Sequence, residues 1–319
     1  MTYSAGNLIV ATDYNGFVST NVGANINATL QYYGQSNVST VSSGGLVTAT
    51  QWATLNGNVT LLANHQATTI TSRANPVAGN TITILANLNT DITNIYNNRQ
   101  NAAASGTQYT AWTGTASKTA ATGSGGASWT ITFTDTVTFA NATAATNFFN
   151  GGGLIKIEFS KSSTGTDADP DWNTFVNTTC GDVYISGTAT SKTIAGTAYT
   201  GTTVVGGTGT PTTLATNTGW SELTANAVSI YKQFNSAYIY TSDFVEITAS
   251  RSSTVLTLTT TWFSALRDFP GASRNISGGT ATTGISFGTA PTTVVTYFPP
   301  STTYLTNVWG TPTVASSVA

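Results

Sequence analysis

The spacing of apolar residues changes partway along this chain, and the change limits the folds that the chain can adopt. Up to about residue 108, apolar side chains recur at every third or fourth position, as on one face of a helix. From about residue 109 they alternate with Thr, Ser or charged residues, as in strands with one buried face. We therefore predict an α+β protein with a small helical domain at 1–108, a mainly antiparallel sheet domain with short covering helices at 109–265, and an extended β/coil segment at 266–319.

Three amphipathic helices are predicted in the first part of the chain. Thr12 or Asp13 is expected to cap the first helix, and Gly34 to end it. Thr48 or Thr50 is expected to cap the second helix, and the third lies within 80–100. Thr and Asn are weak helix formers, so these helices must be held by packing. The predicted core of this unit consists of Phe17, Trp52, Leu55, Leu88 and Ile92.

The second part of the chain alternates most clearly in five segments, and each is predicted to form a strand. They lie within 124–139, 154–160, 181–187, 243–250 and 254–262. Three segments between the strands are predicted as short helices, namely 141–150, 170–179 and 222–235. Three glycines, 151–153, follow the first of these helices and lead into a strand. A phosphate-binding loop has the reverse order, so we interpret the glycines as a helix stop with positive φ and a loose entry to the strand.

Charge and composition exclude several classes of partner. Charged residues make up 7% of the chain, against about 25% in an ordinary domain. The 10% aromatic and 39% hydrophobic content nevertheless indicates a folded protein. Its ten basic residues are scattered, so nucleic-acid binding is not expected. No apolar run approaches the length that spans a bilayer, and the first residues lack the positive region of a secretory signal.

Few residues are of a type and spacing that suggest catalysis or metal binding. His65, the single histidine, is interpreted as a capping or packing residue, and the single cysteine, Cys180, as a buried structural thiol. Asp167, Asp169 and Asp171 have the alternate spacing that begins a calcium loop. A proline interrupts that pattern and its closing glutamate is missing, so we favour a solvated loop in which Asp171 caps a helix starting near residue 172. We predict no catalytic residue, no cofactor and no obligatory metal, with these three aspartates as the weak metal candidates.

Several short motifs, taken in order, resemble a known group of proteins. They are ATDYNGF, VTATQWATLNGNVTLLANHQ, ITFTDTVTF leading to FFNGGGLIKIEFS, DWNTF and YIYTSDFVEITAS. Together they resemble tail-fibre or virion structural proteins of tailed phages that infect marine cyanobacteria and related hosts, over most of the chain up to about residue 265. The resemblance implies a non-enzymatic virion component, and such a protein is assembled in the host cytoplasm. Our first hypothesis is therefore a structural virion protein that is attached through its helical N-terminal part and exposes the β-rich remainder. The resemblance supplies no functional residues.

Two other functions stay open at this stage. A carbohydrate-binding adhesin that recognises a host surface glycan would suit the aromatic and Asn-rich loops. A tail-spike hydrolase would need paired carboxylates in a cleft, and the chain has only three glutamates.

The segment after residue 265 is predicted to be an assembly element. It is rich in Gly, Thr and Pro and has little apolar surface to offset its ordering entropy. Five aromatic residues in it are candidate interface anchors, and prolines favour extended segments that reach across a subunit boundary. We expect the segment to pack against another copy, in a trimeric fibre, or against another virion protein. The alternative is that it lies along its own sheet. The candidate anchors are Phe287, Tyr297, Phe298, Tyr304 and Trp309.

Overall fold

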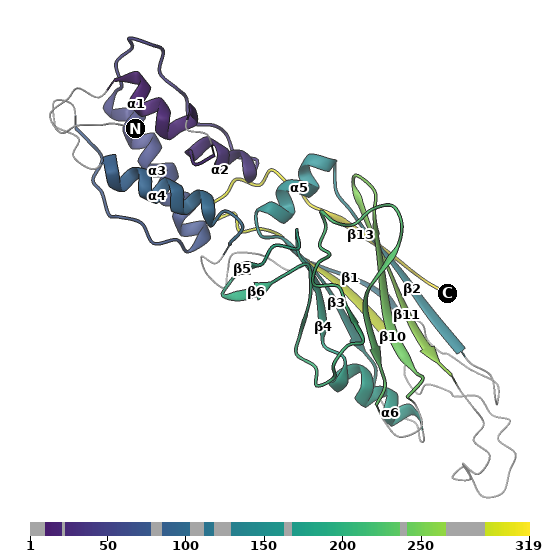
Figure 1. The fold of residues 1–319 in the computed structure, drawn as a ribbon. Helices are drawn as coiled ribbons and strands as arrows, with labels where there is room; N and C mark the ends of the chain where they lie inside the picture. The colour runs from purple at the N-terminus through teal and green to yellow at the C-terminus, as the bar shows by residue number, and fades with distance from the viewer. Residues whose placement is uncertain are drawn as a thin grey trace, which may run out of the picture.

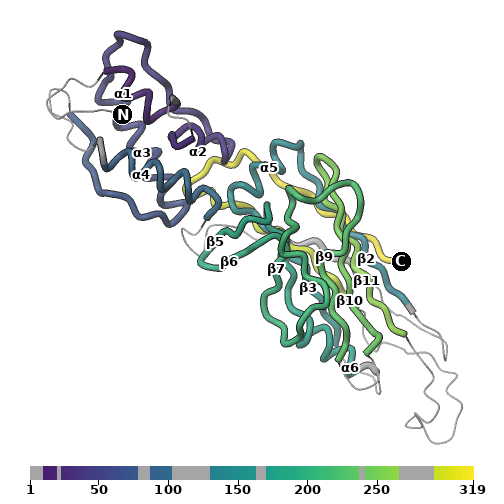
Figure 2. The backbone as a smooth tube through the Cα atoms, viewed as in Figure 1, coloured from purple at the N-terminus to yellow at the C-terminus, as the bar shows by residue number. Residues whose placement is uncertain are grey.

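The computed structural model shows an elongated molecule with helices at one end and β-sheets at the other (Figure 1). The predicted α+β class is confirmed: helices precede residue 98, and mainly antiparallel strands with short helices follow. The smooth trace in Figure 2 shows the C-terminal part of the chain running between the two ends. The structure describes residues 10–20, 23–77, 85–102, 112–117, 129–162, 168–236, 241–265 and 291–319.

The first predicted helix is wrong in its start and its continuity. α1 begins at Ala11, so Thr12 and Asp13 lie inside it, and Asp13 instead accepts a hydrogen bond from the N–H of Val10. A separate helix, α2, starts after Asn25, whose side chain accepts from the backbone of its first turn. The helical elements of this region are α1 (Ala11–Asn15), the π-helical turn η1 (Gly16–Thr20) and α2 (Ile26–Tyr32).

The other helix signals agree with the structure. Gly34 follows α2 with a φ of +71°, as expected of a helix stop. Thr48 caps α3 (Ala49–Gln66) and exchanges hydrogen bonds with Gln51 in a capping box. The third predicted helix is α4 (Leu85–Asn97). The five predicted core residues of the unit are buried and belong to one cluster, which continues into the sheets: Phe17, Trp52, Leu55, Leu88 and Ile92.

Two antiparallel sheets pack face to face in the second part of the molecule. The five-stranded sheet has the order β1-β12-β3-β4-β7 and the six-stranded sheet the order β13-β2-β11-β10-β9-β8. Phe159 of the first sheet contacts Tyr231 and Trp262 of the second, with ring centroids 6.0 and 6.4 Å away. The strands are β1 (Trp112–Ser117), β2 (Trp129–Thr138), β3 (Leu154–Ser160), β4 (Asp182–Ile185), β7 (Thr202–Val205), β8 (Thr213–Leu214), β9 (Val228–Phe234), β10 (Phe244–Arg251), β11 (Val255–Ser264), β12 (Thr292–Phe298) and β13 (Thr313–Val318), besides the small hairpin β5 (Lys192–Ile194) and β6 (Thr197–Tyr199).

The short helices were predicted with mixed success. α5 (Ala142–Asn150) has the expected position. α6 (Ala168–Thr174) begins earlier than expected, so Asp171 lies inside the helix, and its predicted capping role is wrong. The helix predicted at 222–235 is also wrong, because half of that segment forms the strand β9. The register between β9 and β10 is irregular at Ile230, which has no partner on β10. As a result Ile230 and its neighbour Tyr231 are both buried, and the two-residue period that marks a strand in the sequence is interrupted there.

The three consecutive glycines join α5 to β3, as the order of elements predicted. Gly152 has a φ of +101°, which favours glycine. A Cβ atom there would lie 2.4 Å from the Cβ of Ala102, and one on Gly153 would lie 2.4 Å from the Phe148 ring. The glycines therefore let the chain turn where α5, β3 and the end of the helical unit are in close contact.

Candidate functional site

The metal candidates are only partly described by the structure. Asp167 lies outside the described residues, and for Asp169 only the backbone within α6 is described. Asp171 is half-buried on α6, and burial raises the pKa of its carboxyl. Among the described residues, no group of three or more His, Cys, Asp and Glu side chains is placed to hold a metal ion. Calcium binding by these aspartates stays a hypothesis from the sequence.

His65 and Cys180 are buried packing residues. The His65 ring packs edge-on against Tyr33, with centroids 5.0 Å apart, and burial lowers its pKa to about 4. It is therefore neutral near pH 7. Burial raises the pKa of the Cys180 thiol to about 12, so the reactive thiolate is not formed near neutral pH.

The predicted interface aromatics divide into two groups. Tyr297 and Trp309 are buried within this chain, whereas Phe298 and Tyr304 are half-buried. Phe287 lies outside the described residues. β12 pairs with both β1 and β3, and β13 pairs with β2, so the described C-terminal residues lie along the sheets of their own chain. Packing against another copy stays a prediction, but Tyr297 and Trp309 already fill positions inside this molecule.

Between β12 and β13, the C-terminal segment reaches the helical unit and returns (Figure 1). The side-chain amide of Gln35 donates to the Thr306 carbonyl at 3.1 Å and accepts from the Thr306 N–H at 2.8 Å. Asn150 on α5 donates to the Tyr32 carbonyl at 2.8 Å, and Leu305 is buried. We call this junction, formed by Tyr32, Gln35, Asn150, Leu305 and Thr306, the waist. None of its side chains is charged.

Lys192 and Asp135 are two of the buried ionisable groups in the sheet region. The Lys192 ammonium donates to the Phe149 carbonyl at 3.0 Å, and burial lowers its pKa to about 8, a shift that Glu222 partly opposes. Asp135 on β2 points into the core and accepts a hydrogen bond from the Ser316 hydroxyl at 2.5 Å. Burial raises the pKa of Asp135 to about 6. Lys192 is thus bonded to α5, and Asp135 to β13. These hydrogen bonds indicate that the two groups help to hold α5 and β13 in place.

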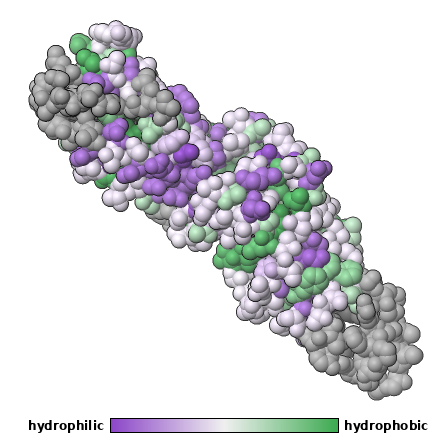
Figure 3. Space-filling view, viewed as in Figure 1, coloured by the Kyte–Doolittle hydropathy of each residue, from purple (hydrophilic) through white to green (hydrophobic). Residues whose placement is uncertain are grey.

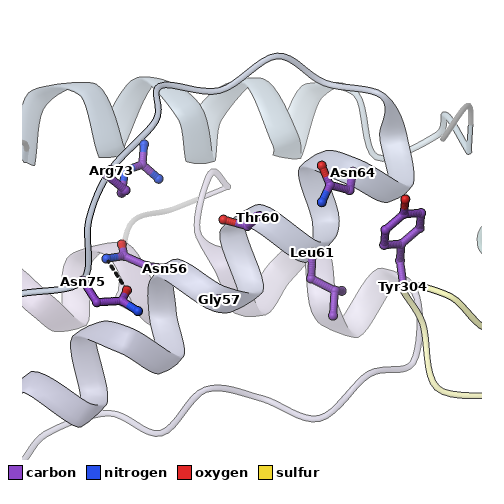
Figure 4. A pocket seen from close by; sticks show the side chains of 8 residues that line it. All are labelled: Asn56, Gly57, Thr60, Leu61, Asn64, Arg73, Asn75 and Tyr304. Atoms are coloured by element: carbon purple, nitrogen blue, oxygen red, sulfur yellow. Dashed lines mark hydrogen bonds between the residues drawn. The ribbon is translucent and has the colours of Figure 1, made fainter.

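A pocket of about 410 Å³ lies beside α3 and is the candidate binding site (Figure 4). Its size is within the range of small-molecule sites. α3 supplies five lining residues, the segment after α3 supplies two, and the C-terminal segment supplies Tyr304. The lining contains no Asp or Glu, so this pocket does not provide the carboxylate pair of a glycosidase. The lining residues are Asn56, Gly57, Thr60, Leu61, Asn64, Arg73, Asn75 and Tyr304.

Hydrogen bonds fix one end of the pocket. The Asn56 amide donates to the Asn75 side-chain oxygen at 3.3 Å, and Arg73 forms an ion pair with Asp91 on α4. Burial lowers the pKa of the Arg73 guanidinium. Within the described residues, Asn56 Oδ1 and Arg73 Nε and Nη1 have no hydrogen-bond partner. This end therefore holds both an unpaired acceptor and unpaired donors.

Comparisons of the chain with protein-family models, with curated proteins and with solved structures found no match. Among the described residues, no helix has the length and apolar content needed to cross a membrane.

Sequence reasoning missed this pocket because Tyr304, in the distant C-terminal segment, joins α3 and the segment after it only in the folded chain. The available signal was Gly57, a glycine in the interior of a predicted helix. Such a residue lowers helix stability and often has a packing or functional reason.

Proposed function

We propose that the chain is a non-enzymatic structural protein of a bacteriophage virion, a tail- or neck-attached fibre component that assembles with itself and with other virion proteins. The ordered motifs that resemble such proteins suggest the role. The observation that carries the proposal is the waist, through which the C-terminal segment joins helices and sheets into one elongated body. An elongated component of an assembly needs its two ends held at a constant separation.

The surface suits association that is insensitive to salt. Most of the described surface in Figure 3 is pale, which corresponds to residues of intermediate hydropathy. Threonines face outward along β2 and β11, for example Thr134, Thr136, Thr257 and Thr259. Contacts between uncharged hydroxyl-rich surfaces have little Coulomb energy for salt to screen. On this proposal the helical unit attaches to the particle and the sheets are exposed.

Two measurements test the proposal. The first is electron microscopy of purified virions with an antibody against this chain, where label at a fixed place on the tail or neck is expected. The second is the mass in solution at low and high salt, where a trimer of the 32.9 kDa chain is expected at both. Absence of the chain from purified virions would overturn the proposal, as would release of reducing ends from host polysaccharide by the purified protein. If the protein is a monomer at both salt concentrations, the trimeric fibre is excluded as part of this proposal.

A further inference from the structure

Gly57 has no conformational or packing reason to be glycine. It lies in the middle of α3, its φ is not in the left-handed region, and a Cβ atom added there would meet nothing within 4 Å. In an exposed helix interior, glycine is less favourable than alanine by about 1 kcal/mol. What the missing side chain does provide is open space on the wall of the pocket (Figure 4). A residue that breaks a local rule without a structural reason is expected at functional sites.

Apart from Arg73, which is paired with Asp91, the polar side chains around this open space are neutral and can both donate and accept hydrogen bonds. Asn64 and Asn75 are exposed and carry amides, and Thr60 is exposed and carries a hydroxyl. Tyr304 is half-buried at the opposite end from Asn56 and presents an aromatic ring (Figure 4). Leu61 adds an apolar surface beside it.

The Asn56 end of the pocket favours a neutral ligand because its one charged side chain is already paired. Asn56 is 6% exposed and the Arg73 side chain 3% exposed, so their unpaired atoms lie beneath the pocket wall, where a bound group does not reach them. Because Asp91 already balances the Arg73 charge, the site has no net charge to attract an anion.

We propose that this pocket binds a neutral saccharide unit. The exposed amides of Asn64 and Asn75 and the Thr60 hydroxyl bind ring hydroxyls, and the Tyr304 ring packs against the C–H face of the sugar. This inference is independent of the proposed structural role, because it concerns an isolated pocket of the purified chain and requires neither assembly nor a virion.

The test uses the full-length chain and a panel of neutral sugars: glucose, galactose, mannose and N-acetylglucosamine. Ligand-observed NMR detects binding, and titration gives the affinity, which we expect near 1 mM for a single unit. Glucuronate and inorganic phosphate serve as anionic probes. If only the anionic probes bind, or if no neutral sugar binds, the proposal is wrong.

Variants at Gly57 separate binding from folding. Gly57→Trp places a large side chain in the open space, so we expect affinity to fall at least about tenfold. Gly57→Ala is the matched control: it adds one Cβ where nothing lies within 4 Å, and we expect it to bind within about twofold of the parent chain and to melt at a higher temperature.

Two further substitutions locate the contacts. Asn64→Ala on exposed helix surface and Tyr304→Ala are each expected to weaken binding, whereas Tyr304→Phe keeps the ring and most of the affinity. Asn217→Ala, on an exposed loop of the sheet region, should leave binding unchanged. Sugar affinity that is the same in Gly57→Trp and Asn64→Ala as in the parent would place the sugar elsewhere and overturn the proposal.

Discussion

At the scale of single residues, Asp135 makes the stability of the molecule depend on pH. Its pKa is about 6 in the folded chain, above the ordinary value of 3.8, because burial disfavours the charged form. The folded state therefore holds more protons than the unfolded state between these values, and stability falls as pH rises through them. We predict that Asp135→Asn stabilises the protein at pH 7.5 by about 2–3 kcal/mol, the equivalent of a shift of about two pKa units. Chemical denaturation at pH 7.5 and pH 4 measures this gain.

The gain should be nearly absent at pH 4, where the carboxyl is protonated in the folded chain. Ser316→Ala is the matched control with the opposite sign: it removes the hydrogen bond that favours the charged form and should destabilise the protein at pH 7.5. An equal effect of Asp135→Asn at both pH values would contradict the assignment to ionisation.

Trp52 is the second residue for which a large effect is expected. It is buried on α3, with ring centroids 5.4 Å from Tyr14 and 6.1 Å from Phe17. Trp52→Ala leaves a cavity among these rings, and we predict a loss of roughly 3–5 kcal/mol in unfolding free energy. Trp52→Phe keeps much of the volume and should cost less. A loss below about 1 kcal/mol, as at surface sites, would show that this core is loosely packed.

At the scale of elements, the turn from α5 into β3 depends on Gly152. Gly152→Ala combines a strained positive φ with a clash against Ala102, so we predict a loss of about 3 kcal/mol. Gly206 supplies the matched control, because its φ is +74° and a Cβ there would meet nothing within 4 Å. Gly206→Ala should therefore cost only about 1 kcal/mol in the same thermal or chemical denaturation. Similar losses at both glycines would mean that contact with Ala102 contributes little.

The accuracy of the sequence prediction also varied by element, for physical reasons. The strand predicted at 154–160 is β3, and the strand predicted within 254–262 is β11, which extends to Ser264. Both alternate cleanly in sequence, whereas the irregular register at Ile230 hid β9. Capping chemistry is local, so Thr48 was identified as one of two candidates. The path of the C-terminal segment depends on distant pairing and could not be derived locally. The pocket was missed for the same reason, since Tyr304 joins residues of α3 only after folding.

At the scale of the whole molecule, the waist couples the helical unit to the sheets through neutral contacts. Deleting everything from residue 291 would remove β12, which lies between β1 and β3, so that deletion would test folding instead of assembly. Substitutions in the waist are a milder change. Gln35→Ala removes two hydrogen bonds to Thr306, and Leu305→Ala removes buried apolar surface.

We predict that the parent chain unfolds in one transition and that the Gln35→Ala, Leu305→Ala double variant unfolds in two, because weaker coupling lets the helices and sheets melt separately. Circular dichroism follows the helices, and amide hydrogen exchange follows both units. Asn217→Ala is the control and should keep one transition. Because no waist side chain is charged, the parent should keep one transition at high salt as well. Two transitions in the parent would show that the waist does not join the units, and would remove the main support for a structural role in the virion.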